Sequence, residues 1–543
     1  MSRYEKQQNK AETSGGRVAV ATIADSIPLG SALPEHIPRS AYFALFVLVL
    51  ANLFNMLDRT IVSILAQSIK ADLHLDDADL GFLLGTAFAV FYSIVGIAMG
   101  RISDFVSRKK MMAFGLALWS VMTAMGGAAV GFATLSAARI GVGVGEAVAN
   151  PCSHSLLADV FPPRNRALAL GTYLTGTFLG SATAMIVGGL FVQKWPDFCT
   201  AVPLAGACGM AGWKAALIAV GMPGLLLALL VLTLHEPPRQ NVQQGGTFGI
   251  VVREVASALP PFTFLSIYRL AGRAGLLRNL FLLAAVSAIA ALLVWISGDI
   301  AQWIACALGA YSIATWGQVQ SHGDKPLYRL TYGDATFVLS IASTALVACI
   351  IAGITVWAAP LAMRTFATVS PVKIGLGLGL IYVAGSILGV VIGGWLTDRW
   401  KARDLRAPLG MATIALLGIV PCIALIVSAK SIEMFFAVYF VMSAFISLWS
   451  GGIAALVQDL VLPRMRGAAA ASYSLVAIVV ASGIGPYWTG KVSKMTGSLG
   501  TGIVSILLLA PVAFLVLYLA ARRLPDETSE RRLALAVAAG EGS

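Results

Sequence analysis

Long apolar segments separated by short polar connections make up most of the chain. Each segment is close to or above the roughly 20 residues with which a helix crosses the hydrocarbon core of a bilayer. A lipid-facing β-barrel would instead show short segments of alternating polarity. The pattern therefore predicts an all-α polytopic membrane protein. Fourteen spanning candidates are residues 41–67, 80–100, 110–131, 133–158, 166–192, 213–233, 277–296, 299–317, 336–360, 374–396, 408–428, 433–457, 467–489 and 499–521.

The composition supports the same class. Hydrophobic residues make up 58% of the 543 residues and charged residues only 12%, whereas roughly a quarter of the residues in an ordinary soluble domain are charged. The net charge of +12 does not indicate a nucleic-acid partner, because Lys and Arg stand at the ends of the apolar segments, where they orient helices. We expect the lipid bilayer, and no nucleic acid, around this protein.

The distribution of Lys and Arg also predicts the orientation. If the N-terminus is cytoplasmic, four short inner loops carry twelve Lys and Arg, and six outer loops carry eight. This inner excess is the usual arrangement, so we expect a multi-pass protein of the cell (inner) membrane with both termini in the cytoplasm. Residues 1–39 lack the apolar core of a signal peptide and are expected to form a disordered tail, and residues 522–543 a second tail.

The chain repeats itself internally. Asp159, Pro163, Arg164 and Arg166 recur 300 residues later, and Gly100 and Asp104 recur 294 residues later. Matching loops at matching places indicate a duplicated transporter with a central cavity between the copies. We expect two six-helix bundles at 40–239 and 336–521, with a linker at 240–335 that holds an extra two-helix hairpin.

One loop motif, one helix motif and several shorter matches carry a resemblance to a known family. The run from Gly96 to Lys110, GIAMGRISDFVSRKK, resembles the signature after the second helix of the major facilitator superfamily, and Arg139 to Ala147, RIGVGVGEA, resembles its fourth-helix motif. The chain is most similar to the spinster-like branch. That likeness rests on Asp58-Arg59, Val142 to Ala147 with Pro151 and Ser155, Ala158 to Pro162, Trp213-Lys214, Gly221, Pro223-Gly224, Glu236-Pro237, Trp357 to Pro360 and Arg364.

The resemblance implies a major facilitator fold and a secondary transporter, not an enzyme. Such a protein works by alternating access and needs no cofactor beyond a proton gradient. The spinster-like likeness implies an amphiphilic anionic lipid as cargo, of the lysophospholipid or sphingoid-phosphate type. The five histidines are scattered without the spacing of a metal site, so we expect no metal.

Charged residues inside predicted spans are the candidate coupling groups, because a charge near the bilayer centre is costly and usually functional. Asp58 and Arg59 lie on the first span, and Arg139 and Glu146 on the fourth. Arg139 and Glu146 are seven residues apart, so they share a helix face about 10 Å apart along the axis. By resemblance, Asp58 and Glu146 are the protonation sites. A static buried network that only joins the two helices is the alternative.

The cargo site is expected between the two bundles near the bilayer midplane. Arg59 and Arg139 are the candidate partners of an anionic group, and Asn150 continues the face of Glu146 by one further step of four residues. Aromatic side chains on the cavity-forming helices would suit the apolar part of an amphiphile. These candidates are Phe54, Phe91, Tyr92, Tyr173, Trp357 and Tyr382.

Two further features concern the two sides of the membrane. The loop signatures predict a cytoplasmic gate, in which an aspartate caps a neighbouring helix and pairs with basic residues; its residues are Gly100, Asp104, Arg108, Lys109, Asp398 and Arg399. Cys199 and Cys208 share one predicted outer loop, where a disulfide is chemically permitted. Two free thiols are the alternative.

Two other functions stay open. The first is proton-coupled transport of a small organic anion, because related anion transporters share much of the pattern from Trp213 to Pro237. The second belongs to another class: a receptor or scaffold that does not transport, with the extra hairpin and the tails as its partner surface. In every case we expect a monomer.

Overall fold

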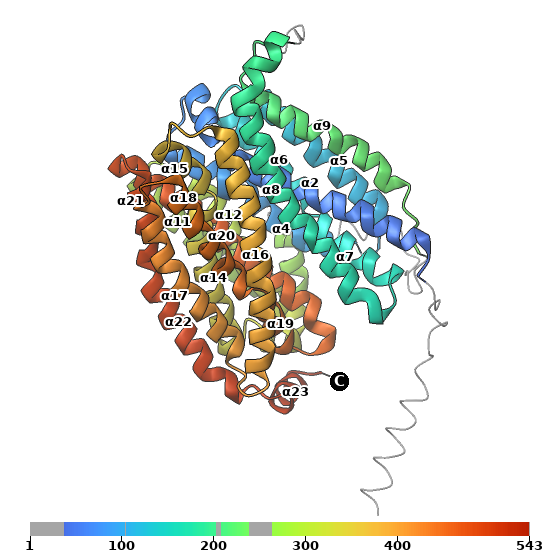
Figure 1. The fold of residues 1–543 in the computed structure, drawn as a ribbon. Coiled ribbons are helices and arrows are strands. Elements are labelled where there is room, and N and C mark those ends of the chain that lie inside the picture. Colours follow the sequence, from blue (N-terminus) through green and yellow to red (C-terminus); the bar gives the residue numbers. More distant parts are fainter. Residues whose placement is uncertain (1–36, 104, 202–207, 238–262, 542–543) are drawn as a thin grey trace, which may run out of the picture.

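The computed structural model describes residues 37–103, 105–201, 208–237 and 263–541, and these residues form helices and short connections without a strand. Figure 1 shows two helical bundles side by side. The first, the N-half, comprises α2 (Arg39–Leu73), α3 (Asp77–Gly81), a π-helical turn (Phe82–Thr86), α4 (Ala87–Ile102), α5 (Arg108–Gly127), α6 (Phe132–Glu146), α7 (Ala149–Val160), α8 (Pro163–Ala201) and α9 (Gly212–Leu232).

The second bundle, the C-half, follows an insert of two long helices and one short helix. The insert comprises α11 (Thr263–Ser297), α12 (Ile300–Gly323) and α13 (Lys325–Leu330). The C-half comprises α14 (Ala335–Thr355), α15 (Ala358–Thr365), α16 (Pro371–Lys401), α17 (Ala407–Val427), α18 (Ile432–Leu448), α19 (Ser450–Asp459), α20 (Arg466–Thr496) with a preceding 3-10 turn (Pro463–Met465), α21 (Leu499–Ser505), a second 3-10 turn (Ile506–Leu509) and α22 (Ala510–Arg523). A last helix, α23 (Ser529–Ala538), follows it.

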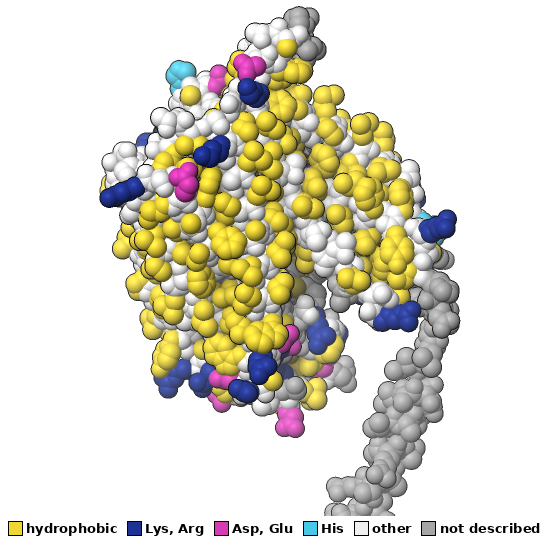
Figure 2. Space-filling view, in the orientation of Figure 1, with side chains coloured by type: hydrophobic (Ala, Val, Ile, Leu, Met, Phe, Trp, Pro, Cys, Tyr) yellow, Lys and Arg dark blue, Asp and Glu magenta, His cyan; other side chains and the backbone are white. Residues whose placement is uncertain are grey.

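All fourteen predicted segments are helical in the structure. Twelve helices or helix pairs of the described chain are long and apolar enough to cross a membrane; α5 and α12 are not among them. Figure 2 shows charged side chains gathered at the two ends of the visible face, with an apolar belt between them. We call one end the terminal face, which carries Arg39, Arg108 and α23, and the other the distal face, which carries Asp77 and the α11–α12 turn.

The two halves break a helix at matching places. The fourth spanning helix divides into α6 and α7 after Glu146, and its counterpart divides into α18 and α19 at Trp449. Pro163 and Pro463 then begin the next helical segments, 300 residues apart, because proline has no N–H to lose at the start of a helix. These breaks agree with the repeat expected from the sequence.

The ends of the chain and of the insert differ from the sequence expectation. Helix α11 begins at Thr263, earlier than residue 277, and a break at Gly272 with φ 62° interrupts it, a conformation that glycine adopts readily. Residues 522–543 are more than a tail, because α23 buries Arg532 against Asp334 and Glu527. The disorder expected of residues 1–39 falls almost wholly outside the described residues.

The halves touch at the distal face and separate towards the terminal face. A Cβ added at Gly81 of α3 would lie 2.6 Å from the carbonyl oxygen of Pro486 in α20, and one at Gly189 of α8 would lie 2.7 Å from that of Pro371 at the start of α16. Small residues therefore allow backbones of opposite halves to meet. At Gly96 and Gly100 in α4, by contrast, an added Cβ would meet nothing within 4 Å.

Candidate functional site

Four charged side chains lie together between α2 and α6 inside the N-half. The Nε of Arg59 donates to Oε2 of Glu146 at 2.6 Å. Arg139 instead donates to two backbone carbonyls, with Nη1 at 3.1 Å from the oxygen of Asp58 and Nε at 3.4 Å from that of Leu83. Asp58, Arg139 and Glu146 are all buried. The sequence predicted this set of residues, and the structure brings all four together.

Glycines place Glu146 in this position. A Cβ added at Gly143 would lie 2.6 Å from the carbonyl oxygen of Phe88 in α4, and one at Gly145 would lie 2.7 Å from the backbone nitrogen of Trp119 in α5. Helix α6 can therefore approach both neighbours only because these positions lack a side chain. The close approach turns Glu146, the last residue of α6, towards Arg59.

The charges balance in number but are not fully satisfied. Two arginines face two carboxylates, yet Oδ1 of Asp58, Oε1 of Glu146 and Nη2 of Arg59 have no hydrogen-bond partner within the described residues. A buried polar atom without a partner costs free energy, so such a group favours any change that supplies one. A proton on a carboxylate, or an anion beside Arg59, would be such a change.

Arg59 connects this network to a second row of polar residues. Its guanidinium lies over the rings of Phe88 and Tyr92, 4.6 Å and 4.3 Å from their centroids. Asn150 in α7 donates to Oη of Tyr92 at 3.1 Å and accepts from Oη of Tyr173 at 3.0 Å. Cation–π contacts hold an arginine without neutralising it. Arg59 thus keeps its charge beside Tyr92, where it is partly exposed.

A cavity of about 560 Å³ opens next to Tyr92 in the terminal half of the molecule. Its α7 wall carries Asn150, His154 and Ser155, whereas its α20 wall is made mainly of small and apolar residues. This volume lies within the range of small-molecule sites. The remaining residues that line it include Ser93, Gly96 and Gly100 of α4, Trp316 of α12, and Ala468, Ala471, Leu475 and Ile478 of α20.

Not all of the predicted binding residues line this cavity. Tyr92 and Asn150 do, and Tyr173 reaches it only through Asn150. Phe54, Phe91 and Tyr382 are half-buried among the helices outside its lining, and Trp357 is fully buried at the distal face. The roles expected of Phe54, Phe91, Trp357 and Tyr382 in binding the cargo therefore stay predictions.

The predicted gate residues at the terminal face separate into two groups. Arg108 is buried and binds Asp159 at 2.5 Å and Oε1 of Glu236 at 3.3 Å, and Lys109 donates to the carbonyl of Leu234 at 3.1 Å. These contacts stay within the N-half. Asp104 lies outside the described residues, and Gly100 lines the cavity.

The C-half has a matching ion pair at the terminal face, with a lysine in place of the arginine. Lys401 pairs with Asp459 at 2.5 Å, as Arg108 pairs with Asp159. Asp398 is exposed, and Arg399 lies over the ring of Trp395 at 5.7 Å. No ion pair between described residues joins the N-half to the C-half at the terminal face.

Glu236 holds the start of α5 to the end of α9. It accepts from Oγ of Ser107 at 2.5 Å and from the backbone nitrogen of Arg108 at 2.8 Å. Burial acts to raise the pKa of Glu236, but these hydrogen bonds outweigh it and leave the pKa below its usual value.

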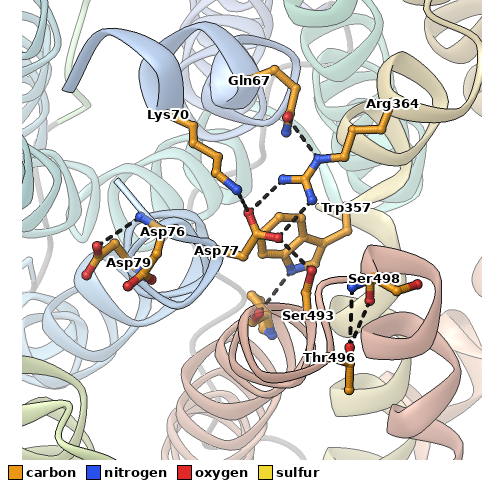
Figure 3. Close-up of polar contacts among 11 residues, drawn as sticks. Gln67, Lys70, Asp76, Asp77, Asp79, Trp357, Arg364, Ser493, Thr496 and Ser498 are labelled. Carbon is orange, nitrogen blue, oxygen red and sulfur yellow. Dashed lines mark hydrogen bonds and ion pairs between the residues drawn. The ribbon is translucent and has the colours of Figure 1, made fainter. Parts of the chain in front are cut away.

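The distal face is closed by a cluster that the sequence did not reveal (Figure 3). Arg364 of α15 donates two hydrogen bonds to the carboxylate of Asp77 in α3, at 2.6 Å and 2.8 Å. Its Nε donates to Gln67 at 2.9 Å. Lys70 and Ser493 also donate to Asp77, each at 2.6 Å. Arg364 and Ser493 belong to the C-half, so Asp77 ties the halves together.

Two neighbouring contacts extend this distal closure. The indole nitrogen of Trp357 donates to the carbonyl of Pro486 at 3.0 Å. Lys494 pairs with Asp76 at 2.6 Å. Burial acts to raise the pKa of Asp76, yet the hydrogen bonds from Lys494 and from the backbone of Asp79 hold it below its usual value. The sequence offered two signals for this cluster, an acidic residue at the start of the second span and the family motif residues Trp357 and Arg364, but not their contact.

Cys199 and Cys208 form a disulfide at the distal end of α8, with Cα atoms 5.4 Å apart. Cys152, Cys306, Cys349 and Cys422 are not part of a disulfide. Within the described residues no group of three or more His, Cys, Asp or Glu could hold a metal ion.

Comparisons with known sequences and solved structures give the following similarities. A model of the Major Facilitator Superfamily matches residues 48–353. An "MFS-type efflux pump" of Mycolicibacterium smegmatis is 28% identical over 88% of this chain and 91% of its own, and protein spinster homolog 3 of Mus musculus is 24% identical over 90% and 82%. A crystal structure of a bacterial homolog to the human lysosomal transporter Spinster, in an inward-facing and unoccupied conformation, aligns with a TM-score of 0.68 at 22% identity over 90% of this chain and 98% of that one.

Proposed function

Because the chain belongs to the Major Facilitator Superfamily, we propose that it is a proton-coupled secondary transporter that moves an anionic amphiphile by alternating access. The observation that carries this proposal is the ion pair between Arg59 and the buried Glu146, because Arg59 also contacts Tyr92, which lines the cavity. In this proposal the terminal face lies in the cytoplasm, so the described conformation is open inwards.

The proton and the substrate anion act on the same arginine. While Glu146 is ionised, it holds the guanidinium of Arg59. Protonation of Glu146 removes this charge partner, and Arg59 becomes available to an anionic group that enters beside Tyr92. An anion and a proton therefore favour each other's binding, which is the reciprocity that linkage requires. Asp58, the second buried carboxylate, supplies a further protonation site next to Arg139.

The difference between the two faces supports alternating access. The halves are joined at the distal face by Arg364 and Asp77 and are apart at the terminal face. Breaking the distal cluster while the terminal ends approach each other would open the cavity to the other side. Binding of cargo and proton neutralises the buried charges and so lowers the cost of that movement.

The composition of the cavity favours an amphiphile. Its α7 wall is polar, whereas Ala468, Leu475 and Ile478 of α20 give the opposite wall an apolar surface. A lysophospholipid or a sphingoid phosphate would place its head group near Arg59 and its chain along α20. The spinster-like resemblance of the sequence, which implies a lipid cargo, supports this choice.

A small organic anion is the second candidate, because several relatives that match part of the chain transport such compounds by name. A probable L-galactonate transporter of Escherichia coli is 28% identical over 36% of this chain and 39% of its own. Arg59 would serve a sugar acid as well as a phosphate, but such a cargo would leave the apolar wall without a function.

The test is flux of labelled lysophosphatidylglycerol into proteoliposomes with and without a pH gradient. We expect flux that depends on the gradient, and we expect Glu146→Gln to lose this dependence while it keeps exchange without a gradient. Labelled glucuronate, tested in parallel, identifies the second candidate. Absence of flux for both compounds would falsify the transport proposal for these cargo classes and favour a receptor or scaffold.

A further inference from the structure

The inserted helix α12 lies along the seam between α4 of the N-half and α20 of the C-half. Its seam-facing residues include Gln302, Gly309 and Trp316, which are seven residues apart. Seven residues make almost two whole helical turns, so the three positions share one face. Helix α11 packs on the other side of α12, where the buried Asn279 donates to Thr315 and Gln318 at 3.3 Å and 2.9 Å.

The distal part of this face touches both halves. Gln302 accepts from Thr86 of the N-half at 2.7 Å and donates to the carbonyl of Gly483 in α20 at 2.7 Å. Two turns further on, a Cβ added at Gly309 would lie 2.8 Å from Val479 of α20 and 3.5 Å from Val90 of the N-half. Along this stretch α12 fills the groove between the two helices.

The terminal part of the face is bonded to the C-half. The indole nitrogen of Trp316 donates to Oγ of Ser472 in α20 at 3.1 Å, and Nε2 of Gln320 lies 3.4 Å from the same oxygen. Asp324, at the end of α12, pairs with Arg464 at 2.8 Å. At this level the cavity lies between α4 and Trp316.

We propose that α12 is a wall of the substrate cavity that moves with the C-half, and that Trp316 contacts the apolar part of the bound substrate. This inference rests on the proposed transport of an amphiphile. Across the cavity, Tyr92 and Asn150 supply polar groups, and Tyr92 lies against the guanidinium of Arg59. The head group therefore binds on the N-half side, and the chain lies against the indole ring and the small residues of α20.

The position of Trp316 in the wall is testable without any substrate. In Trp316→Cys, a membrane-impermeant maleimide applied from the terminal face should label the introduced thiol. Ile289→Cys on the exposed side of α11 is the matched control and should stay unlabelled, since it faces lipid. The unaltered protein gives the background of its own cysteines. Absence of labelling above this background in Trp316→Cys would overturn the wall assignment, whatever the cargo proves to be.

Substrate contact is tested by the dependence of transport on chain length. For a palmitoyl lysophosphatidylglycerol we expect Trp316→Ala to raise KM about tenfold, because the indole supplies a large apolar contact, and for an octanoyl analogue we expect a rise of less than about threefold. Trp316→Phe should retain most of the affinity. Ser472→Ala removes the hydrogen bond but leaves the ring, so its KM should stay within about twofold.

The outcomes separate this inference from the function on which it rests. Equal increases in KM for both chain lengths, or an effect of Ser472→Ala as large as that of Trp316→Ala, would show that Trp316 only packs against α20. If the unaltered protein transports neither compound, the proposed function fails and the substrate contact fails with it. The labelling result then still decides whether α12 forms the cavity wall.

Discussion

Arg59 has two kinds of neighbour, and they hold it in different ways. Glu146 neutralises it through one short hydrogen bond, whereas Phe88 and Tyr92 support the flat guanidinium without removing its charge. Only the first interaction depends on protonation. The rings of Phe88 and Tyr92 keep the guanidinium of Arg59 in place when a proton on Glu146 weakens the ion pair. Arg59 can then bind a second anion without a large movement.

A charge-conserving substitution tests this role of the guanidinium. Lysine keeps the positive charge but lacks the planar group that stacks on Tyr92 and donates from a fixed direction. We expect Arg59→Lys to lower proton-driven flux about tenfold or more while the protein stays folded. Arg522→Lys, whose guanidinium lies over Tyr518 far from the cavity, is the matched control and should transport normally. Equal flux in the two variants would contradict the proposed role.

Glu236 gives the molecule a pH-dependent contact outside the membrane. Its pKa is lower in the folded protein than the ordinary value of 4.5. The contact therefore stabilises the fold fully above that ordinary value, and this stabilisation is lost as the pH falls through the lowered value. We expect Glu236→Gln to reduce the free energy of unfolding by about 1 to 3 kcal/mol near neutral pH. Thermal unfolding of the variant and the unaltered protein, measured from neutral to acidic pH, checks this expectation. The difference in stability between the two proteins should become smaller as the pH falls.

At the scale of helices, close contacts between backbones decide which surfaces can part. Gly81 and Gly189 lie between the halves. Gly385 lies inside the C-half, where an added Cβ would lie 2.7 Å from the carbonyl oxygen of Phe440 in α18. The first two contacts must break when the distal face opens. The third holds one half together and does not change.

A side chain at Gly81 should therefore act as a wedge. Overpacking costs about 1 to 3 kcal/mol, and at Gly81 this cost falls only on the conformation with a closed distal face. We expect Gly81→Val to reduce the population of that conformation at least fivefold, measured by distances between spin labels on the distal ends of the halves. Gly385→Val should destabilise the C-half without changing the distance distribution. A closed distal face in Gly81→Val would refute the expectation.

The limits of the sequence appear clearly in the same helices. Hydropathy located all fourteen segments, and the charged residues in them identified the Arg59 and Glu146 network. It did not show which side of each helix faces the cavity, because a helix that is apolar all round gives no rotational signal. The sequence therefore could not tell that Tyr92 lines the described cavity while Phe54 and Tyr382 lie outside its lining. Nor did it show that Arg364 meets Asp77, a contact across 287 residues that only the packing of two halves creates.

At the scale of the whole molecule, one arginine and one aspartate carry much of the distal closure. Arg364→Ala removes two hydrogen bonds to a charged group, each worth about 1.5 to 3 kcal/mol. We expect it to shift the equilibrium towards an open distal face at least tenfold. Lys70→Ala is the control, since Lys70 and Asp77 both belong to the N-half. Labelling of a distal cysteine by an impermeant maleimide should rise in the first variant only.

The helix that covers the seam between α4 and α20 also gives the protein a front and a back within the plane of the membrane. The second seam, between α8 and α16, has no such cover among the described helices, and Figure 2 shows a notch where these two helices diverge towards the terminal face. For the lipid cargo proposed above, we expect entry from the bilayer at the notch between α8 and α16 and not along the side that the insert covers.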